Sequence, residues 1–150
     1  MKTNIFTSKA NTLKFLQEKI TKSKIERIFD FTTEEWEKNE LNILENIETV
    51  FNGSLVIIRS SAVGEDTIEK SKAGNFTSVL NVNSKSRTKL KKLIETVINS
   101  YVKNSQPNYN NQILIQKQTT NVITSGVLFT KTPDIGAPYY VINFEDGKDT

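Results

Sequence analysis

The sequence predicts an α+β fold in which helices cover one side of a mixed, partly antiparallel sheet. Segments with helical and with strand periodicity alternate through residues 8–102, and three strand segments follow one another after a loop at 104–111. The chain has 150 residues, which is the usual size of one domain and is enough to bury a core. We therefore expect one domain over residues 1–150 rather than two.

The first third of the chain predicts two helices around a short edge strand. Apolar residues at helical spacing indicate a first helix within 8–20, and the loose alternation of 24–31 indicates the strand. Thr32 and Glu35 form the capping-box pattern that begins a second helix, and Asn52-Gly53 has the left-handed C-cap chemistry that ends it. Its apolar stripe comprises Trp36, Ile43, Leu44, Ile47, Val50 and Phe51. Because the tryptophan lies on this stripe, we expect a core residue rather than a stacking platform.

The remaining chain predicts five strands and a third helix. The helix begins near Ser84 and has a continuous apolar stripe. The strands comprise residues 55–58, 76–82, 112–118, 125–130 and 139–144. The second of them is expected to return beside the first, with Val82 and either Val79 or Leu80 turned to the core.

Composition excludes several classes of chemistry. The chain has no cysteine and no histidine, which excludes disulfides, catalytic triads with histidine and Cys- or His-ligated metals. The net charge of +3 is too small to indicate nucleic acid or an anionic membrane as a partner. No segment has the pattern of a secretory signal or the length of a bilayer span, so we expect a cytoplasmic protein without a membrane partner.

Arg59 ends the apolar run 55–58 and is the first candidate for a binding residue. Its guanidinium is charged at any relevant pH and has a fork of donors that matches phosphate or carboxylate oxygens. The residues after it, 60–64, are serine or small residues, so their backbone N–H groups and the Ser60 hydroxyl suit an anion. A polyphosphate fits this chemistry. The alternative is a connector loop whose arginine pairs with a surface carboxylate.

Two groups of cations have both a binding and a solvent-facing interpretation. Lys9 stands at the start of the first predicted helix, where a cation opposes the helix dipole but suits a bound phosphate. Five cations begin the third helix: Lys85, Arg87, Lys89, Lys91 and Lys92. They are similar to a nucleic-acid patch, but solvated side chains on an outer helix face are the commoner explanation. No interleaved aromatic platform supports RNA binding, so we expect no nucleic-acid partner.

The central stretch resembles a known family in three consecutive motifs. They are Arg-Ser-Ser-Ala at 59–62, Gly-Glu-Asp at 64–66 and Ser-x-Ala-Gly-x-Phe at 71–76. This order resembles the nucleotide-binding domain of the phosphoenolpyruvate synthase and pyruvate phosphate dikinase family, which has an ATP-grasp fold. The resemblance implies that Arg59 binds the phosphates of ATP and that the loop with Ser71, Ala73 and Gly74 closes over them.

The opening of the chain extends the resemblance. Residues 8–13, Ser-Lys-Ala-Asn-Thr-Leu, are similar to the family's Gly-Gly-Lys-x-x-Asn-Leu, whose lysine contacts ATP phosphates. The resemblance gives Lys9 that role. The family's double glycine is replaced here by Thr7-Ser8, so the shape of this turn differs from the family pattern.

The later strands extend the resemblance over essentially the whole chain. Residues 112–116 resemble the family's strand at the hinge between the two ATP-grasp halves, where adenine lodges. This likeness implies base contacts by Gln116 and Lys117. Residues 125–130 resemble the family's Ser-Gly-Val-x-Phe-Thr strand, after which this chain has Lys131 in place of a frequent arginine. A lysine at that position is a point charge and lacks the bidentate fork.

The resemblance also implies a reaction. The family converts ATP to AMP and phosphate and passes the β-phosphoryl through a histidine on a swivelling domain to an acceptor on a third domain. This chain has no histidine, and its Mg²⁺ ligands are expected beyond residue 150. We therefore expect the N-terminal, ATP-binding part of a longer, AMP-forming phosphotransferase. It has no catalytic residue of its own, is inactive alone and works with downstream phosphohistidine and acceptor domains.

Three segments indicate a branch of the family. Residues 31–36, 111–116 and 137–143 look most like the branch associated with surface-polysaccharide gene clusters. That likeness implies that the small-molecule acceptor is the amide nitrogen of L-glutamine, in capsular polysaccharide modification. The alternatives are a phosphoenolpyruvate synthase-like or rifampin phosphotransferase-like enzyme with another acceptor, or a non-catalytic nucleic-acid-binding or partner-binding module.

Overall fold

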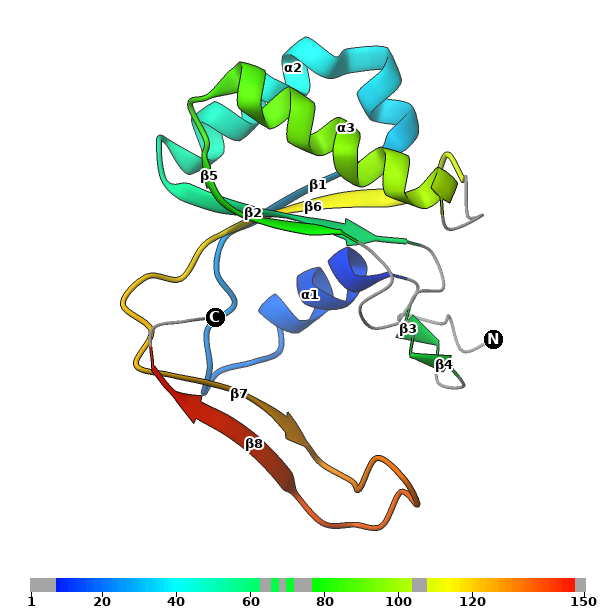
Figure 1. Ribbon diagram of the computed structural model, residues 1–150, viewed down its shortest axis with the longest axis vertical. Helices are drawn as coiled ribbons and strands as arrows, with labels where there is room; N and C mark the ends of the chain where they lie inside the picture. The colour runs from blue at the N-terminus through cyan, green and yellow to red at the C-terminus, as the bar shows by residue number, and fades with distance from the viewer. Residues whose placement is uncertain (1–7, 63–65, 68–69, 72–76, 104–107, 148–150) are drawn as a thin grey trace. The chain divides into compact units, whose positions relative to one another are not determined.

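A computed structural model describes residues 8–62, 66–67, 70–71, 77–103 and 108–147 (Figure 1). For 66–67, 70–71 and Lys103 it describes the backbone alone. The chain divides into two compact units, Met1–Gln118 and Thr119–Thr150, each of which has its own sheet. None of the helices in the described ranges is long and apolar enough to cross a bilayer.

The first unit is built on a four-stranded sheet in the order β1-β6-β2-β5. These strands are β1 (Ile28–Thr32), β2 (Leu55–Ser61), β5 (Ser78–Asn83) and β6 (Gln112–Lys117). Each neighbouring pair is antiparallel, β1 is an edge strand and β5 returns beside β2, as the sequence predicts. A separate short hairpin joins β3 (Asp66–Thr67) to β4 (Lys70–Ser71).

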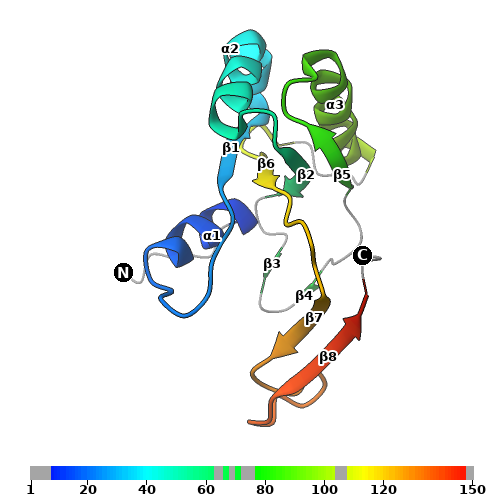
Figure 2. The same ribbon diagram turned by 90° about the vertical axis from the view of Figure 1, so that its left-hand side faces the viewer.

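Two long helices cover one face of this sheet (Figure 2). They are α2 (Thr33–Phe51) and α3 (Arg87–Lys103). The capping box predicted for α2 is present: the Thr32 hydroxyl accepts from the Glu35 N–H, and the Glu35 carboxylate accepts from the Thr32 N–H. The helix ends at Asn52, which has a φ of 43°, the left-handed conformation that this C-cap requires.

The main core fills the space between the sheet and these two helices. It comprises Phe31, Trp36, Ile43, Leu44, Ile47, Phe51, Val56, Ile58, Ala62, Val82, Leu90, Ile94, Val97, Tyr101, Ile113 and Ile115. Trp36 is stacked on Phe31 with ring centroids 5.6 Å apart, which confirms its prediction as a core residue. Val102, also predicted on the stripe of α3, is 62% exposed.

A bulge in β5 determines that Val79, rather than Leu80, faces the core. Val56 and Ile58 on β2 face Val82 and Val79, so β5 has one extra residue in this interval. Asn81 absorbs it with a φ of 59°. Val79 therefore packs against the core, whereas Leu80 is exposed.

The first helix lies on the other face of the sheet (Figures 1 and 2). This helix, α1 (Lys9–Gln17), contacts β6 and is connected to the sheet by polar bonds rather than by a wide apolar stripe. The α+β fold class is confirmed, and it is consistent with an ATP-grasp-like domain. The expectation that helices cover only one side is wrong, because α1 packs on the second face.

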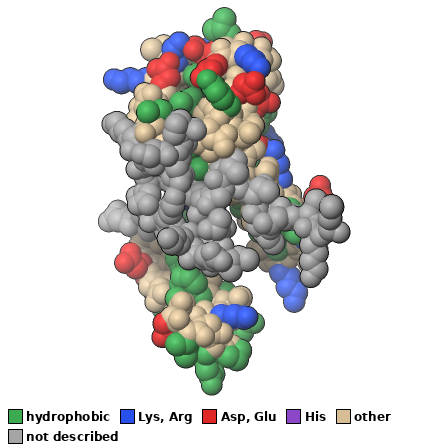
Figure 3. Space-filling model, turned by 90° about the vertical axis from the view of Figure 1, so that its right-hand side faces the viewer, with side chains coloured by type: hydrophobic (Ala, Val, Ile, Leu, Met, Phe, Trp, Pro, Cys, Tyr) green, Lys and Arg blue, Asp and Glu red, His purple; other side chains and the backbone are tan. Residues whose placement is uncertain are grey.

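The second unit is a hairpin of β7 (Thr124–Phe129) and β8 (Val141–Asp146). Both strands are found, but β8 begins two residues later than predicted because the turn extends through Tyr139, whose N–H donates to the Ala137 carbonyl (2.8 Å). Most apolar side chains of this hairpin are exposed, and Figure 3 shows hydrophobic side chains gathered over its lower end.

Candidate functional site

Arg59 lies on the face of the sheet that carries α1, which we call the α1 face. Side chains alternate along a strand, so Arg59 points away from the core residue Ile58. Its Nη1 donates to Oε1 of Gln116 on β6 at 3.3 Å. None of the ion pairs found among the described residues involves Arg59. The partly buried guanidinium therefore has a neutral amide as its described partner, and the alternative of pairing with a surface carboxylate is not observed within the described ranges.

Lys9 begins α1, and this end of the helix is attached to the sheet close to Arg59. The N–H of Ala10 donates to Oγ of Ser61 at 2.8 Å, a bond between residues that are fully buried. Ser61 lies two residues beyond Arg59 on the same strand and therefore on the same face. The structure thus places the residue next to Lys9 against the strand that carries Arg59.

The first turn of α1 already has partners for two of its N–H groups. The Ser8 hydroxyl accepts from the Asn11 N–H (3.3 Å), and the Ala10 N–H is bonded to Ser61. Helix N-termini usually bind anions through such N–H groups. At this helix both of these N–H groups are therefore already bonded within the protein.

Ser60 lies on the opposite face of the sheet from Arg59 and Gln116. It pairs with Ile113 on the face covered by α2 and α3, and its side chain is 2% exposed. The sequence predicts a loop directly after Arg59, but β2 continues to Ser61. Because the strand continues, alternation turns the Ser60 hydroxyl into the core and away from a ligand on the α1 face.

Gln116 and Lys117 lie on opposite faces of β6. Gln116 contacts Arg59, whereas Lys117 lines a separate cavity of about 180 Å³ together with Lys24 and Glu26. Lys24 donates to Glu26 at 3.0 Å and lowers the pKa of that carboxyl, and the positive charge of Lys117 adds to the effect. The structure therefore brings Gln116, but not the Lys117 side chain, to the α1 face.

The remaining predicted residues are described only in part. The backbone of Ser71 pairs with Asp66 in the β3–β4 hairpin, and Ala73 and Gly74 lie outside the described residues. Lys131 is exposed and belongs to the second unit, at the start of the turn after β7. Of the nine predicted residues, the structure brings Lys9, Arg59 and Gln116 to one face.

Gln112 and Asp30 are not among the predicted site residues, but they also lie on the α1 face. Gln112 Nε2 donates to Oδ2 of Asp30 at 3.0 Å, and Asp30 forms an ion pair with Lys14 of α1 at 2.6 Å. The Asp30 side chain is only 7% exposed. Phe29 and Phe31 turn to the core, so alternation places Asp30 on the other face of β1, and no local pattern indicates that α1 covers it there.

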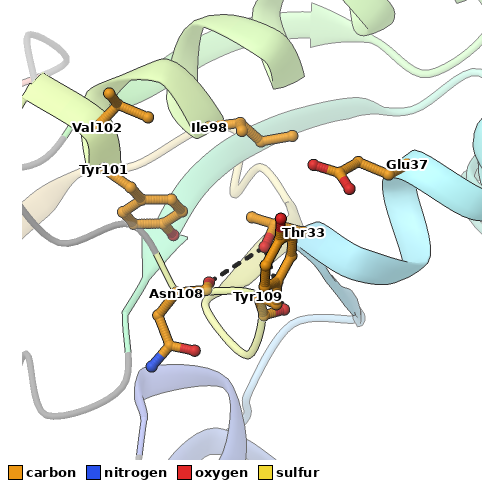
Figure 4. A pocket seen from close by; sticks show the side chains of 7 residues that line it. All are labelled: Thr33, Glu37, Ile98, Tyr101, Val102, Asn108 and Tyr109. Carbon is orange, nitrogen blue, oxygen red and sulfur yellow. Dashed lines mark hydrogen bonds between the residues drawn. The ribbon is translucent and has the colours of Figure 1, made fainter.

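A second cavity lies on the opposite side of the sheet, between the start of α2 and the end of α3 (Figure 4). Its volume is about 230 Å³, and its lining comprises Thr33, Glu37, Ile98, Tyr101, Val102, Asn108 and Tyr109. The Thr33 hydroxyl is used within the protein, because it bonds to the main-chain carbonyls of Asn108 and Tyr109 at 3.2 and 3.1 Å. None of the predicted site residues lines this cavity.

The cations that begin α3 are partly neutralised by α2. Arg87 pairs with Glu48 at 2.7 Å, and Lys91 pairs with Glu40 at 2.7 Å. Positive and negative side chains are intermixed over this helical layer in Figure 3. In the described ranges, no group of three acidic residues is placed to hold a metal ion.

A family model for the AMP/ATP-binding domain of pyruvate phosphate dikinase matches residues 4–147. A comparison with curated proteins finds no match. The family match covers nearly the whole chain, including α1, the four-stranded sheet and the hairpin, and it confirms the family that the motifs around Lys9, Arg59 and Gln116 indicated. The chain therefore belongs to the family of the AMP/ATP-binding domain of pyruvate phosphate dikinase.

Proposed function

We propose that the α1 face binds the phosphates of ATP, with Arg59 and Lys9 as its cationic contacts. The observation that carries this proposal is the position of Arg59: it is partly buried and its described partner is the neutral amide of Gln116. A phosphate oxygen that replaces this amide gains a charge-assisted hydrogen bond, which is roughly twice as strong as a neutral one. The attachment of α1 to Ser61 keeps Lys9 on the same side of the sheet.

We further propose that the remaining predicted residues complete the nucleotide site. Ser71, Ala73 and Gly74 would close over the phosphates, as the family resemblance implies. Gln116 would contact the base, and Lys131 would add a positive charge. The Lys117 side chain is left out because it lies on the opposite face of β6 from Gln116. The Ser60 side chain is left out because it is turned into the core.

The reaction follows from the family resemblance rather than from groups within this chain. We propose that the whole protein is an AMP-forming phosphotransferase, with magnesium ligands, a phosphohistidine domain and an acceptor domain beyond residue 150. The chain has no histidine, which agrees with a role in which these residues hold the nucleotide and another domain carries the phosphohistidine. L-glutamine is the acceptor we propose, from the likeness of 31–36, 111–116 and 137–143 to the glutamine kinase of capsular phosphoramidate synthesis.

A nucleic-acid-binding module is the second candidate, and the structure favours it less. The cation cluster at the start of α3 suggested nucleic-acid binding, but Arg87 and Lys91 of this cluster are paired with carboxylates of α2. A phosphate backbone would have to compete with these ion pairs. Binding of RNA that falls steeply with salt would support this candidate, because counterion release produces that dependence.

Titration with MgATP tests the proposed phosphate contacts. We expect the chain to bind MgATP, and we expect Arg59→Ala and Lys9→Ala each to weaken binding by about 10- to 100-fold, since each removes a charge-assisted contact. Lys92→Ala is the matched control, because it removes an exposed cation on α3 and should leave the affinity unchanged. Equal affinities for the parent and both site variants would contradict the proposal.

The acceptor requires the full-length protein. We expect it to release AMP from ATP in the presence of L-glutamine and not with pyruvate, which chromatography of the nucleotides would measure. AMP release that depends on pyruvate would replace the glutamine proposal with a phosphoenolpyruvate synthase-like reaction and would leave the phosphate contacts of Arg59 and Lys9 unaffected.

A further inference from the structure

Gln112, the first residue of β6, uses its whole carboxamide group to connect α1 to the sheet. Its Oε1 accepts from the hydroxyl of Ser8, which is the N-cap of α1. Its Nε2 donates to Oδ2 of Asp30 at 3.0 Å and approaches Oδ1 of Asn11 at 3.4 Å. One side chain therefore joins the first turn of α1 to the edge strand β1.

The main chain of Gln112 is fixed from the other side of the sheet. The Tyr101 hydroxyl of α3 donates to the Gln112 carbonyl at 2.5 Å and accepts from the Ser61 N–H at 2.9 Å. Ser61 and Gln112 are partners in the β2–β6 register, so this hydroxyl bridges the two residues that hold α1. Tyr101 is 2% exposed, and its ring lines the cavity in Figure 4. Packing in the core therefore holds Gln112 and Ser61 in place.

Lys9 lies between the two points at which α1 is attached. Ser8, before it, is bonded to Gln112, and Ala10, after it, is bonded to Ser61. The first turn of a short helix opens easily unless it is held, because its N–H groups lack partners within the helix. The position of the Lys9 main chain, from which the ammonium extends, therefore depends on whether these two bonds persist.

We propose that Gln112 is a positioning residue that holds Lys9 at the phosphates of ATP. This inference rests on the proposed function, since it concerns how the cationic contact is held and not whether ATP binds. Gln112 does not itself touch the nucleotide in this arrangement. Its effect on affinity is transmitted through Ser8 and the first turn of α1.

The role requires an amide rather than a carboxylate. A glutamate at this position still accepts from the Ser8 hydroxyl but loses the donor to Asp30. It also places a second carboxylate beside Asp30, whose side chain is 7% exposed, and like charges at such a site repel. Changing Asp30 to asparagine at the same time restores one donor and one acceptor across this contact.

The test therefore compares Gln112→Glu, Asp30→Asn and the double variant with the parent chain. We expect Gln112→Glu to weaken MgATP binding by about 10-fold, the effect of losing one or two net hydrogen bonds. The double variant should recover the affinity of Asp30→Asn alone, because these two variants both lack the Lys14–Asp30 ion pair. We also expect faster hydrogen exchange at the Ala10 amide in Gln112→Glu and recovery in the double variant. Gln17→Glu is the matched control, because it makes the same chemical change at an exposed position of α1.

The outcomes separate the inference from the proposed function. In one outcome, the parent binds MgATP, Lys9→Ala weakens binding, and Gln112→Glu speeds hydrogen exchange at Ala10 without weakening binding. This outcome overturns the positioning role of Gln112 and leaves the proposed phosphate contacts in place. If Gln112→Glu weakens binding and the double variant binds more weakly than Asp30→Asn alone, the donor to residue 30 is not the cause and the proposal fails. If the parent does not bind MgATP, the proposed function fails and the positioning role fails with it.

Discussion

The two faces of the four-stranded sheet differ in what their side chains do. The face under α2 and α3 is closed by fully buried aliphatic residues such as Val56, Ile58 and Ile115. The α1 face has polar and charged residues on the same strands, among them Arg59 and Gln116, which bond to each other. Because these sets alternate along the same strands, one face of the sheet carries the main apolar core and the other carries the polar groups that we propose bind phosphate.

The largest expected difference concerns two neighbours on β2. Ile58→Ala removes a fully buried side chain on the core face and should lower the free energy of unfolding by about 2–5 kcal/mol. Ile57→Ala, on the partly covered α1 face, should cost only about 1 kcal/mol because less apolar area is buried there. Urea denaturation would measure both. Similar losses at the two positions would mean that the faces do not differ in this way.

An intermediate effect is expected for the ion pair that closes the α1 face. Lys14→Met leaves Asp30 without its cation, although Asp30 keeps the bond from Gln112, and should lower the free energy of unfolding by about 1–2 kcal/mol. The same lysine change in an Asp30→Asn background should cost less. A double-mutant cycle from thermal unfolding gives the coupling, and a coupling of zero would show that α1 is held without this pair.

The smallest effect is expected on the outer side of the helical layer. Glu40 accepts a hydrogen bond from Lys91 and raises the pKa of that lysine above its ordinary value of 10.5. Because the pKa of Lys91 is higher in the folded chain than in the unfolded chain, the ion pair stabilises the fold fully at pH values below the unfolded-state pKa. This stabilisation is lost as the pH rises through the folded-state pKa. Lys91→Met should therefore lower the melting temperature slightly at pH 7, and the difference should shrink above about pH 10.5. A difference independent of pH would contradict the assignment.

Much of the core face was predictable from the sequence. The capping box at Thr32, the C-cap at Asn52 and the apolar stripe of α2 are local patterns, and the structure confirms each of them. The apolar run that begins at Leu55 likewise identifies β2 as an interior strand. Such features are predictable because each depends on residues close together in the sequence.

The α1 face was predictable only in part, because its contacts join distant residues. Ser8 and Gln112 are 104 residues apart, so no local pattern indicates their bond. The burial of Ser60 depends on where β2 ends, and the sequence predicted that end too early. The placement of Val79 in the core depends on a bulge at Asn81, which periodicity alone does not reveal.

The hairpin shows a different limit. Its apolar residues, among them Val127, Ile142 and Phe144, have the pattern of buried strands, yet they are more than half exposed in the second unit. A two-stranded hairpin cannot bury its own side chains, because burial needs a further packed layer. The sequence therefore predicted the two strands, and the second unit by itself supplies no layer to cover them.

The central claim is tested most directly by a crystal structure of the chain with MgATP. We expect the Arg59 guanidinium to release Gln116 and to contact phosphate oxygens at about 2.7–2.9 Å, with the Lys9 ammonium on the same phosphates. A structure in which Arg59 still donates to Gln116 while the phosphates are bound elsewhere would contradict the claim.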